Sequence, residues 1–185
     1  MKQGRIVFRG KTKAGKVFIF RYPERGDVVI LTEYINKLSK EQTFIGFQGE
    51  QISQKQEKEY LNKFLKKIKN REAVQLYAFV GSELIGVSSI ELSERSVHKH
   101  LGAFGISIAK EYRNQGIGRK FMEKVMGEAK KNLPGLEIIT LTLFANNPIA
   151  LKLYRNFGFK EFGRLPKGVI HRGKFVDHLH MYKKI

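Results

Sequence analysis

The chain has 185 residues, 42% of them hydrophobic and 11% aromatic, and its 35 Lys and Arg against 17 Asp and Glu give a formal net charge of +18. This length and composition predict one globular domain with its own core. They exclude an intrinsically disordered chain and collagen-like or proline-rich material. Because the sequence has no cysteine, a disulfide framework, a thiolate metal site and a cysteine nucleophile are excluded as well.

The sequence gives no sign of a membrane or export signal. The longest uncharged stretch, residues 138–151, is interrupted by Asn146, Asn147 and Pro148 and is too short to cross a bilayer. The first residues lack the apolar core of a signal peptide, and the absence of cysteine suits a reducing compartment. We therefore expect a cytoplasmic protein without a membrane partner.

The positive charge is dispersed along the chain. It is spread over residues 1–26, 55–71, 110–132 and 164–185, whereas residues 72–109 are locally acidic. Such an excess attracts polyanions, so we expect a weak attraction to nucleic acid. A lysine-rich solvated surface of the kind found in heat-tolerant proteins accounts for the same charge, and the sequence leaves both explanations open.

The first half of the chain alternates between β-rich runs and helices. Residues 5–9 and 16–22 predict a hairpin, and Asp27 is a candidate cap for a helix running to about Leu38. Ser53 and Gln56 form a capping box for a helix that ends near Asn70. The following β-rich runs predict a second hairpin and one more strand, over residues 74–80, 84–92 and 103–109.

The second half contains a strand-helix-strand unit. Apolar residues recur every four positions from Ile117 to Ala129 and predict a helix over 116–132, followed by a strand over 136–144. Such a crossover makes its two flanking strands parallel. A shorter helix over 148–156, with Asn146 or Asn147 as its N-cap, and strands over 159–162 and 175–183 complete an α+β fold around a mixed sheet.

A glycine-containing turn precedes the 116–132 helix. It reads Arg113-Asn114-Gln115-Gly116-Ile117-Gly118, and glycines at a helix N-terminus let the backbone approach a ligand closely. The unpaired N–H groups and the positive end of the helix dipole favour a phosphate there, and Arg113 and Arg119 add full charges. This short motif also occurs in ordinary strand-to-helix turns, so the surrounding sequence decides whether it indicates a phosphate site.

Two motifs together resemble the GNAT superfamily of acetyl-CoA-dependent N-acetyltransferases. The turn at 113–118 follows an apolar strand, and residues 147–159 read N-x-x-A-x-x-L-Y-x-x-x-G-F. The resemblance begins near Val17, and residues 173–182 are similar to the branch of ribosomal-protein N-terminal and related amine acetyltransferases. It implies a mostly antiparallel sheet with one parallel crossover and helices on both faces. One domain is implied over 1–185, with 1–22 as a hairpin extension plus first strand and 103–159 as the acetyl-CoA-binding core.

The resemblance also implies roles for single residues. Backbone amides from Gln115 to Arg119 would hold the CoA pyrophosphate, the main chain of Ile106 and Ile108 would pair with the pantetheine arm, and Tyr154 would stand near the thioester sulfur. The implied cofactor-binding residues are Ile106, Ser107, Ile108, Arg113, Asn114, Gln115, Gly116, Ile117, Gly118, Arg119, Asn147, Ala150 and Tyr154.

Acetyl transfer to nitrogen needs a neutral amine and a proton for the departing thiolate. A phenol can donate that proton, so Tyr154 receives the general-acid role. Glu91 is the first candidate for the base and His100 the second, although Glu91 as a surface charge and His100 as an ordinary histidine stay open. Where some family members place a catalytic carboxylate, this chain has Gly102, Phe104 and small or apolar neighbours.

Other signals point to ordinary structure. Residues 10–16 fit the phosphate-loop pattern G-x-x-x-x-G-K, but Val17 replaces the Ser or Thr and a β-rich run follows, so we expect a turn. His178 and His180 would share one strand face with His171 nearby, yet no carboxylate spacing supports them, and we expect no metal.

We therefore predict an enzyme that transfers acetyl from acetyl-CoA to a primary amine by direct attack in a ternary complex. The preferred acceptor is a protein N-terminal amine of the ribosomal-protein type, and a polyamine or small amine is the alternative. Glu91 and Glu94 could receive a cationic amine locally. An alternative of another class is a basic nucleic-acid-binding module on the same fold. The sequence leaves the oligomeric state open, a homodimer included.

Overall fold

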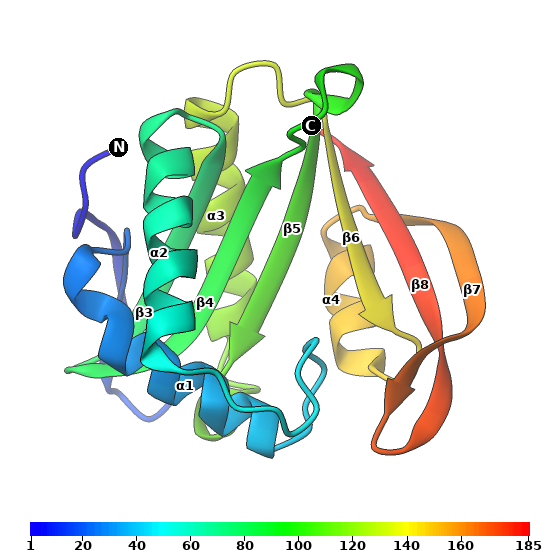
Figure 1. The fold of residues 1–185 in the computed structure, drawn as a ribbon, viewed down its shortest axis with the longest axis horizontal. Helices are drawn as coiled ribbons and strands as arrows, with labels where there is room; N and C mark the ends of the chain where they lie inside the picture. The colour runs from blue at the N-terminus through cyan, green and yellow to red at the C-terminus, as the bar shows by residue number, and fades with distance from the viewer.

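A computed structural model describes all residues, 1–185, and contains one eight-stranded sheet and four α-helices (Figure 1). The strands are β1 (Ile6–Lys11), β2 (Val17–Arg21), β3 (Ala73–Val80), β4 (Glu83–Leu92), β5 (Leu101–Ile108), β6 (Ile138–Phe144), β7 (Lys160–His171) and β8 (Lys174–Lys184). The helices are α1 (Val28–Lys40), α2 (Gln54–Lys69), α3 (Ile117–Asn132) and α4 (Pro148–Asn156).

The sheet is mixed in the predicted way. Its strand order is β1-β2-β3-β4-β5-β6-β8-β7, and every neighbouring pair is antiparallel except β5 and β6. These two parallel strands are joined by α3, which is the crossover that the periodicity of residues 117–129 predicts. The α+β fold class is therefore confirmed.

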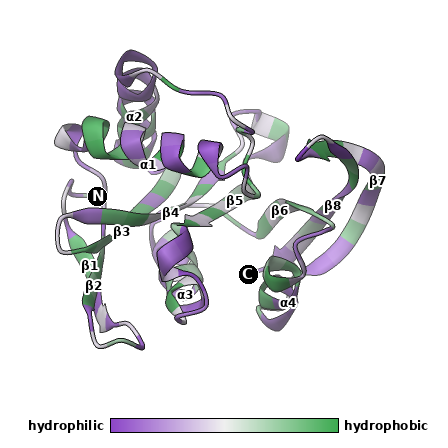
Figure 2. Ribbon diagram, turned by 90° about the horizontal axis from the view of Figure 1, so that it is seen from below, coloured by the Kyte–Doolittle hydropathy of each residue, from purple (hydrophilic) through white to green (hydrophobic).

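Helices cover both faces of the sheet, as expected. Figure 2 shows α1 and α2 on one side of the strands and α3 and α4 on the other. On the first face, the Tyr34 hydroxyl of α1 lies 3.0 Å from Ser107 Oγ of β5. On the second, the rings of Phe121 (α3) and Phe20 (β2) stack with centroids 4.4 Å apart. None of the helices combines the length and the apolar character needed to cross a membrane.

The first hairpin and the capping box of α2 form as predicted. The Gly15 N–H donates to the Thr12 carbonyl at 2.9 Å and the Thr12 N–H donates to the Lys16 carbonyl at 2.8 Å, so the G-x-x-x-x-G-K match contains the β-turn of the β1–β2 hairpin. The Ser53 hydroxyl accepts from the Gln56 N–H at 3.3 Å, and Gln56 Oε1 accepts from the Ser53 N–H at 2.9 Å. Both backbone donors at the start of α2 are thereby satisfied.

Asp27 occupies the predicted N-cap position of α1, but its side chain does not cap that helix. Its carboxylate accepts from both terminal nitrogens of Arg21, at 2.6 and 2.9 Å, and from the Glu24 N–H at 2.9 Å. A bidentate bond to a guanidinium outweighs a single N-cap bond, so the buried carboxylate turns toward β2. The capping bond predicted for Asp27 therefore does not form, although the predicted start of the helix is correct.

Strand β7 is longer than the predicted 159–162 strand, because it continues to His171. Pro166 lies within β7, and it is tolerated there because β7 is the edge strand of the sheet. The register with β8 shifts between Leu165 and Val169, and this bulge accommodates the break. The extension adds Val169 and Ile170 beside the β5–β6 region.

The stacked pair of Phe121 and Phe20 yields a stability prediction. Phe121 is fully buried, so Phe121→Ala should lower the free energy of unfolding by about 3–5 kcal/mol through lost burial and a cavity. Phe162→Ala is the matched control, since that ring is 60% exposed, and its cost should stay below about 1 kcal/mol. Urea denaturation of both variants measures the difference, and equal losses would contradict the assignment of the core.

Candidate active site

The parallel strands β5 and β6 pair over only part of their length. Leu101, Gly102 and Ala103 match Ile138, Ile139 and Thr140, and beyond this point the two strands have no register partners in each other. From there β5 pairs only with β4, and β6 pairs only with β8. Figure 1 shows the two strands diverging from this closed end. The divergence leaves a wedge-shaped gap in the middle of the sheet.

The main chain of β5 turns free polar groups toward this gap. The Ala109 N–H donates to the Ile85 carbonyl at 2.9 Å, and the Leu101 carbonyl accepts from the Ser93 N–H, so these odd-numbered residues face the β4 side. Main-chain groups alternate along a strand, so those of Ile106 and Ile108 face the gap. One of them is already bonded, because the Ile108 carbonyl accepts from Arg113 Nε at 2.8 Å.

The N-terminus of α3 lies at the open end of the gap. Gly116 is its N-cap residue, with φ +80°, and no side chain caps the helix. The first backbone bond into the helix runs from the Lys120 N–H to the Gly116 carbonyl, so the amides of residues 117–119 precede the intrahelical ladder. A Cβ on Gly118 would lie 3.3 Å from Ile108 Cδ1, which shows how closely this turn approaches β5. The turn fits a phosphate group through its free N–H donors and the helix dipole.

The two arginines of the turn are not equivalent. The Arg113 guanidinium donates to Glu41 Oε2 at 2.9 Å as well as to the Ile108 carbonyl, so Glu41, which follows α1, neutralises its charge. The Arg119 side chain is 75% exposed, and its nearest carboxylate, Glu123, is 3.7 Å away. Of the two charges expected at the turn, the one of Arg119 is therefore available to an anion, and Arg113 orders the β5 end instead.

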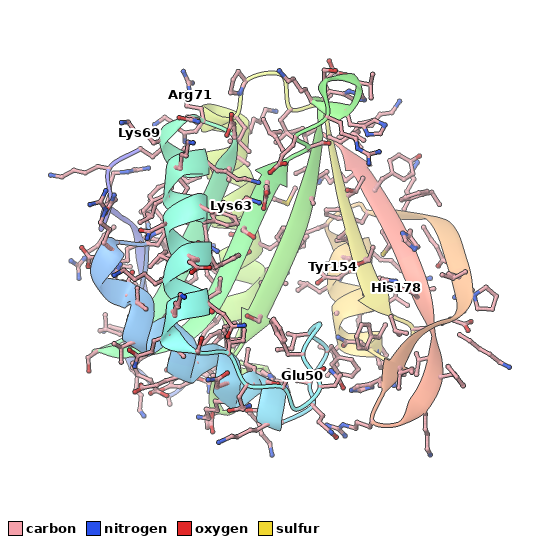
Figure 3. All side chains as sticks on the ribbon, in the orientation of Figure 1. Glu50, Lys63, Lys69, Arg71, Tyr154 and His178 are labelled. Carbon is pink, nitrogen blue, oxygen red and sulfur yellow. The ribbon has the colours of Figure 1, made fainter.

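Tyr154 lies on α4 at the side of the gap (Figure 3). Its ring packs edge-on against Phe104 with centroids 6.0 Å apart and also contacts Phe159. Burial is the only influence on the Tyr154 phenol, whose hydroxyl makes no hydrogen bond within the protein, and the residue is 7% exposed. Burial raises the pKa of the Tyr154 phenol to about 12, so the hydroxyl keeps its proton at neutral pH.

The raised pKa of Tyr154 is itself testable. An ordinary phenol ionises near pH 10, whereas Tyr154 should still be protonated at about pH 11. A titration of phenolate absorbance, compared between the wild-type protein and Tyr154→Phe, should therefore show no difference between the two up to that pH. A difference that develops around pH 10 would contradict the raised pKa of Tyr154.

A cleft of about 930 Å³ joins these features. It contains most of the expected cofactor-binding residues: Ile106, Ser107, Ile108, Arg113, Asn114, Gly118, Asn147, Ala150 and Tyr154. The remaining residues of the turn do not line it; Ile117 is buried in the core and Gly116 is exposed beside it. Asn147 is the N-cap of α4, because its Oδ1 accepts the Ala150 N–H at 3.1 Å.

The cleft also extends onto the α1–α2 face, where residues outside the two sequence motifs line it. Tyr60 of α2 and Gln75 of β3 line it there, together with Phe44 and Ile45 of the loop between α1 and α2. That loop is held from β7, since His171 Nε2 lies 2.9 Å from the Gln42 carbonyl. Gln75 has a recognisable signal, because it is a polar residue in the otherwise apolar strand Ala73–Val80.

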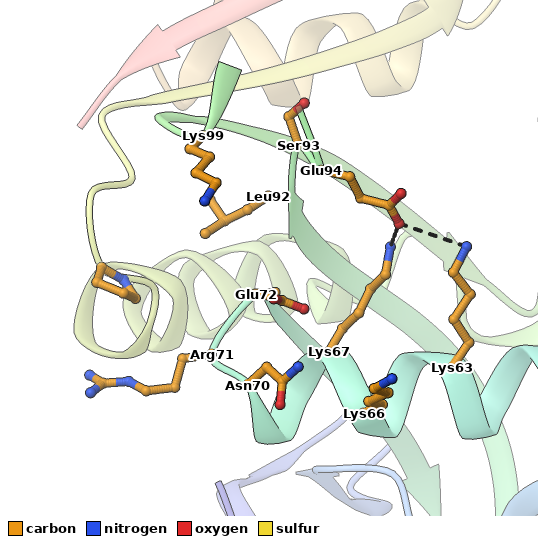
Figure 4. Close-up of a pocket in the computed structure, with 11 residues that line it drawn as sticks. Lys63, Lys66, Lys67, Asn70, Arg71, Glu72, Leu92, Ser93, Glu94 and Lys99 are labelled. Carbon is orange, nitrogen blue, oxygen red and sulfur yellow. Dashed lines mark hydrogen bonds and ion pairs between the residues drawn. The ribbon is translucent and has the colours of Figure 1, made fainter. Parts of the chain in front are cut away.

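The structure does not bring the two candidate bases to this cleft. The Glu91 carboxylate accepts from the ammonium group of Lys67, and His100 precedes β5 at the closed end of the gap. Glu91 lies beside a second cleft of about 580 Å³, whose eleven lining residues include Lys63, Lys67 and Glu94. Figure 4 shows the two ammonium groups converging on Glu94, at 2.6 and 3.8 Å.

The three histidines of β7 and β8 have different surroundings. His171 is buried between Asn146 Nδ2, 2.9 Å away, and the Gln42 carbonyl, and it therefore anchors a loop. His178 and His180 stand side by side on β8 with ring centroids 5.1 Å apart. Burial and the neighbouring His180 lower the pKa of His178, which lines the cleft and is therefore neutral near pH 7.

Comparisons with known proteins agree with this geometry. Residues 33–159 match the model of the acetyltransferase (GNAT) family. The L-amino acid N-acetyltransferase AaaT of Escherichia coli K12 is 29% identical over 107 residues, which cover 58% of this chain and 65% of that protein. The [ribosomal protein bS18]-alanine N-acetyltransferase of the same strain is 34% identical over 58 residues, covering 31% of this chain and 38% of that protein.

A solved structure matches over a longer range. The acetyltransferase of the GNAT family from Streptococcus pneumoniae superposes with a TM-score of 0.82 and 28% identity, over 91% of this chain and 99% of that one. The family match covers more than half of the chain and includes the wedge between β5 and β6, the α3 turn and α4. The chain belongs to the GNAT acetyltransferase family.

Proposed function

We propose that this protein transfers an acetyl group from acetyl-CoA to a primary amine, by direct attack while both substrates are bound. One observation carries the proposal: the cleft beside the β5–β6 gap is lined both by Gly118, at the uncapped N-terminus of α3, and by Tyr154 of α4. Acetyl-CoA, when bound, supplies an acyl group already activated as a thioester.

Successive residues along the cleft fit the successive parts of acetyl-CoA. The amides around Gly116 and Gly118 bind the diphosphate, because they are the unbonded donors of a helix N-terminus. The polar main-chain groups of Ile106 bind an amide-containing arm as a neighbouring strand would. Asn147, whose Nδ2 has no protein partner, faces the same cleft. These contacts orient the thioester beside Tyr154.

Tyr154 acts on the departing sulfur. Nitrogen forms a bond to the acyl carbon, the carbon–sulfur bond breaks, and the proton that the nitrogen loses balances the one that the sulfur gains. Complete transfer from a phenol with pKa about 12 to a thiolate with pKa about 8.5 is uphill by about 5 kcal/mol. The acid role of Tyr154 is therefore that of a hydrogen-bond donor to the developing negative charge, and the sulfur draws its final proton from solvent or from the nitrogen.

The acceptor that we propose is the N-terminal amine of a peptide or protein. An α-amine has an ordinary pKa of about 7.7–8.0, so a large fraction is neutral near pH 7.5 without a strong base. None of the residues lining the cleft is an Asp or Glu, so the cleft holds no partner for the second cation of a polyamine. The net charge of +18 opposes the approach of a polyamine as well.

The proposal is tested by incubating the protein with acetyl-CoA and a panel of acceptors. The panel holds peptides with free N-termini, the same peptides with blocked N-termini, free amino acids, and spermidine. Mass spectrometry should find one acetyl group on the free-amine peptides and none on the blocked ones. Preferred acetylation of spermidine would overturn the choice of acceptor, and no acetylated product from any amine would overturn the activity.

The α-amine acceptor leads to a prediction about Glu91. Because its carboxylate is bonded to Lys67 outside the cleft, Glu91→Gln should leave kcat within about twofold and should not move the pH profile of kcat/KM. Steady-state rates between pH 6 and 9 measure both. A large loss of kcat with a shifted profile would instead give Glu91 the role of the base.

A free amino acid is a second candidate acceptor. The observation in its favour is the 29% identity to the Escherichia coli L-amino acid N-acetyltransferase. The apolar residues of the cleft, such as Phe44 and Phe144, suit an apolar amino-acid side chain as well as the first residue of a peptide. The free amino acids in the same panel decide between the two, through their kcat/KM relative to peptides that begin with the same residue.

A further inference from the structure

Three residues in register form a row across the sheet. Gln75 of β3 is the partner of Ser89 of β4, and Ser89 is the partner of Gly105 of β5. All three line the cleft. The row lies on the face that α1 and α2 cover, because the hydroxyl of Tyr60 on α2 lies 3.2 Å from Gln75 Nε2. Its Gly105 end lies on β5 beyond the last residue that pairs with β6, in the cleft that Tyr154 also lines.

No feature of the protein itself requires a glycine at position 105. Its φ is not in the left-handed region, and a Cβ built on it would meet only Ser89 Oγ, at an ordinary contact distance of 3.9 Å. Neither the backbone nor the packing therefore requires a glycine in the middle of this exposed stretch of strand. A glycine at such a position marks the close approach of a ligand or of another backbone.

Gln75 has a polar atom without a partner. The residue is fully buried, its Nε2 bonds to Tyr60, and its Oε1 has no hydrogen-bond partner. Buried polar atoms are rarely left unpaired, so this atom points to a ligand that completes its bonding. A peptide main chain carries both N–H and C=O groups, and it can therefore satisfy the amide of Gln75 in either orientation.

The length of the row fits a short extended chain. Neighbouring strands are about 4.8 Å apart, so Gln75 and Gly105 are separated by about 10 Å between their Cα atoms. An extended peptide advances about 3.3 Å per residue, and about three residues cover that distance. A single amino acid or its amide is too short to extend from Gly105 to Gln75.

We propose that the row of Gln75, Ser89 and Gly105 binds the main chain of an extended peptide acceptor. The first residue of the peptide lies at the Gly105 end with its amine in the gap, and a main-chain group two or three residues later pairs with the Gln75 amide. The inference rests on the proposed function and deepens it, since the row distinguishes a peptide N-terminus from a free amino acid or a small amine.

The test compares two acceptors, a tetrapeptide and the amide of its first residue, at saturating acetyl-CoA. Gln75→Met should lower kcat/KM for the tetrapeptide about tenfold through KM and leave that of the single-residue amide within about twofold. Gly105→Ala should raise KM for both acceptors about tenfold, because both pass this point. Calorimetry should show acetyl-CoA affinity unchanged in both variants.

Matched controls are available in the chain. Gln54→Met repeats the first change at an exposed residue of α2, and Gly127→Ala repeats the second in α3, where a Cβ meets nothing within 4 Å. Both should keep wild-type values for both acceptors. If Gln75→Met impairs folding, which its melting temperature reveals, Gly105→Ala still tests the end of the row at the gap, since a Cβ at Gly105 makes only an ordinary contact.

The experiment distinguishes a failure of the row from a failure of the proposed function. An unchanged ratio of kcat/KM between tetrapeptide and amide in Gln75→Met, or an unchanged KM in Gly105→Ala, overturns the row while the wild-type enzyme still acetylates peptides. If the wild-type protein binds acetyl-CoA and acetylates neither acceptor, the proposed function fails, and the row is overturned with it.

Discussion

Replacing Tyr154 with phenylalanine is expected to lower the rate of acetyl transfer about 100-fold, at the low end of what a positioned proton or hydrogen-bond donor contributes. The affinity for acetyl-CoA should change by less than about twofold, because the ring and its packing against Phe104 and Phe159 remain. The fold should be unaffected, since the hydroxyl has no partner in the protein to lose.

The measurement is a single-turnover rate with the protein in excess over acetyl-CoA, together with calorimetry for acetyl-CoA binding. Tyr182→Phe on β8 is the matched control, because it removes a phenol that does not line the cleft. That variant should keep the wild-type rate. A wild-type rate in Tyr154→Phe, under conditions in which the chemical step limits turnover, would remove Tyr154 from the reaction and leave its ring as packing.

Local sequence signals predict the crossover and its flanking strands well. The four-residue recurrence of Ile117, Phe121, Val125 and Ala129 defines α3, and all four side chains are buried. Asn147 and Pro148 mark the start of α4 because a side-chain acceptor and a fixed φ suit a first helical turn. The cofactor side of the cleft is built from these neighbouring segments, and it is therefore recognisable from two short motifs.

The acceptor side depends on contacts that are distant in sequence. Gln75 and Gly105 come together only through the pairing of β3, β4 and β5, and Phe44 reaches the cleft through a loop that His171 holds from β7. No single segment contains that information. The same reason explains Glu91: its position at the end of β4 suggests a base, but its partner, Lys67, is on helix α2, which is distant in the sequence.

Gly116→Ala is expected to weaken acetyl-CoA binding at least tenfold. Gly116 has φ +80°, a conformation that costs an L-residue about 1–2 kcal/mol, so the turn either bears this strain or relaxes and moves the amides that follow it. A Cβ at this position meets no protein atom within 4 Å and projects into open space beside the helix N-terminus. A bound diphosphate needs that space and those amides in place, so its affinity falls in either case.

Gly127→Ala separates this effect from a general change in α3. Gly127 is in the interior of the same helix, a Cβ there also meets nothing, and alanine should stabilise the helix by about 1 kcal/mol. Calorimetric titration with acetyl-CoA should therefore give a Kd raised at least tenfold for Gly116→Ala and unchanged for Gly127→Ala. Desulfo-CoA, which retains the diphosphate but lacks the thiol, should show the same loss with Gly116→Ala, because the substitution acts on the diphosphate. Equal affinity of Gly116→Ala and the wild-type protein for both ligands would mean that the diphosphate binds elsewhere, and the orientation of the thioester toward Tyr154 would lose its physical basis.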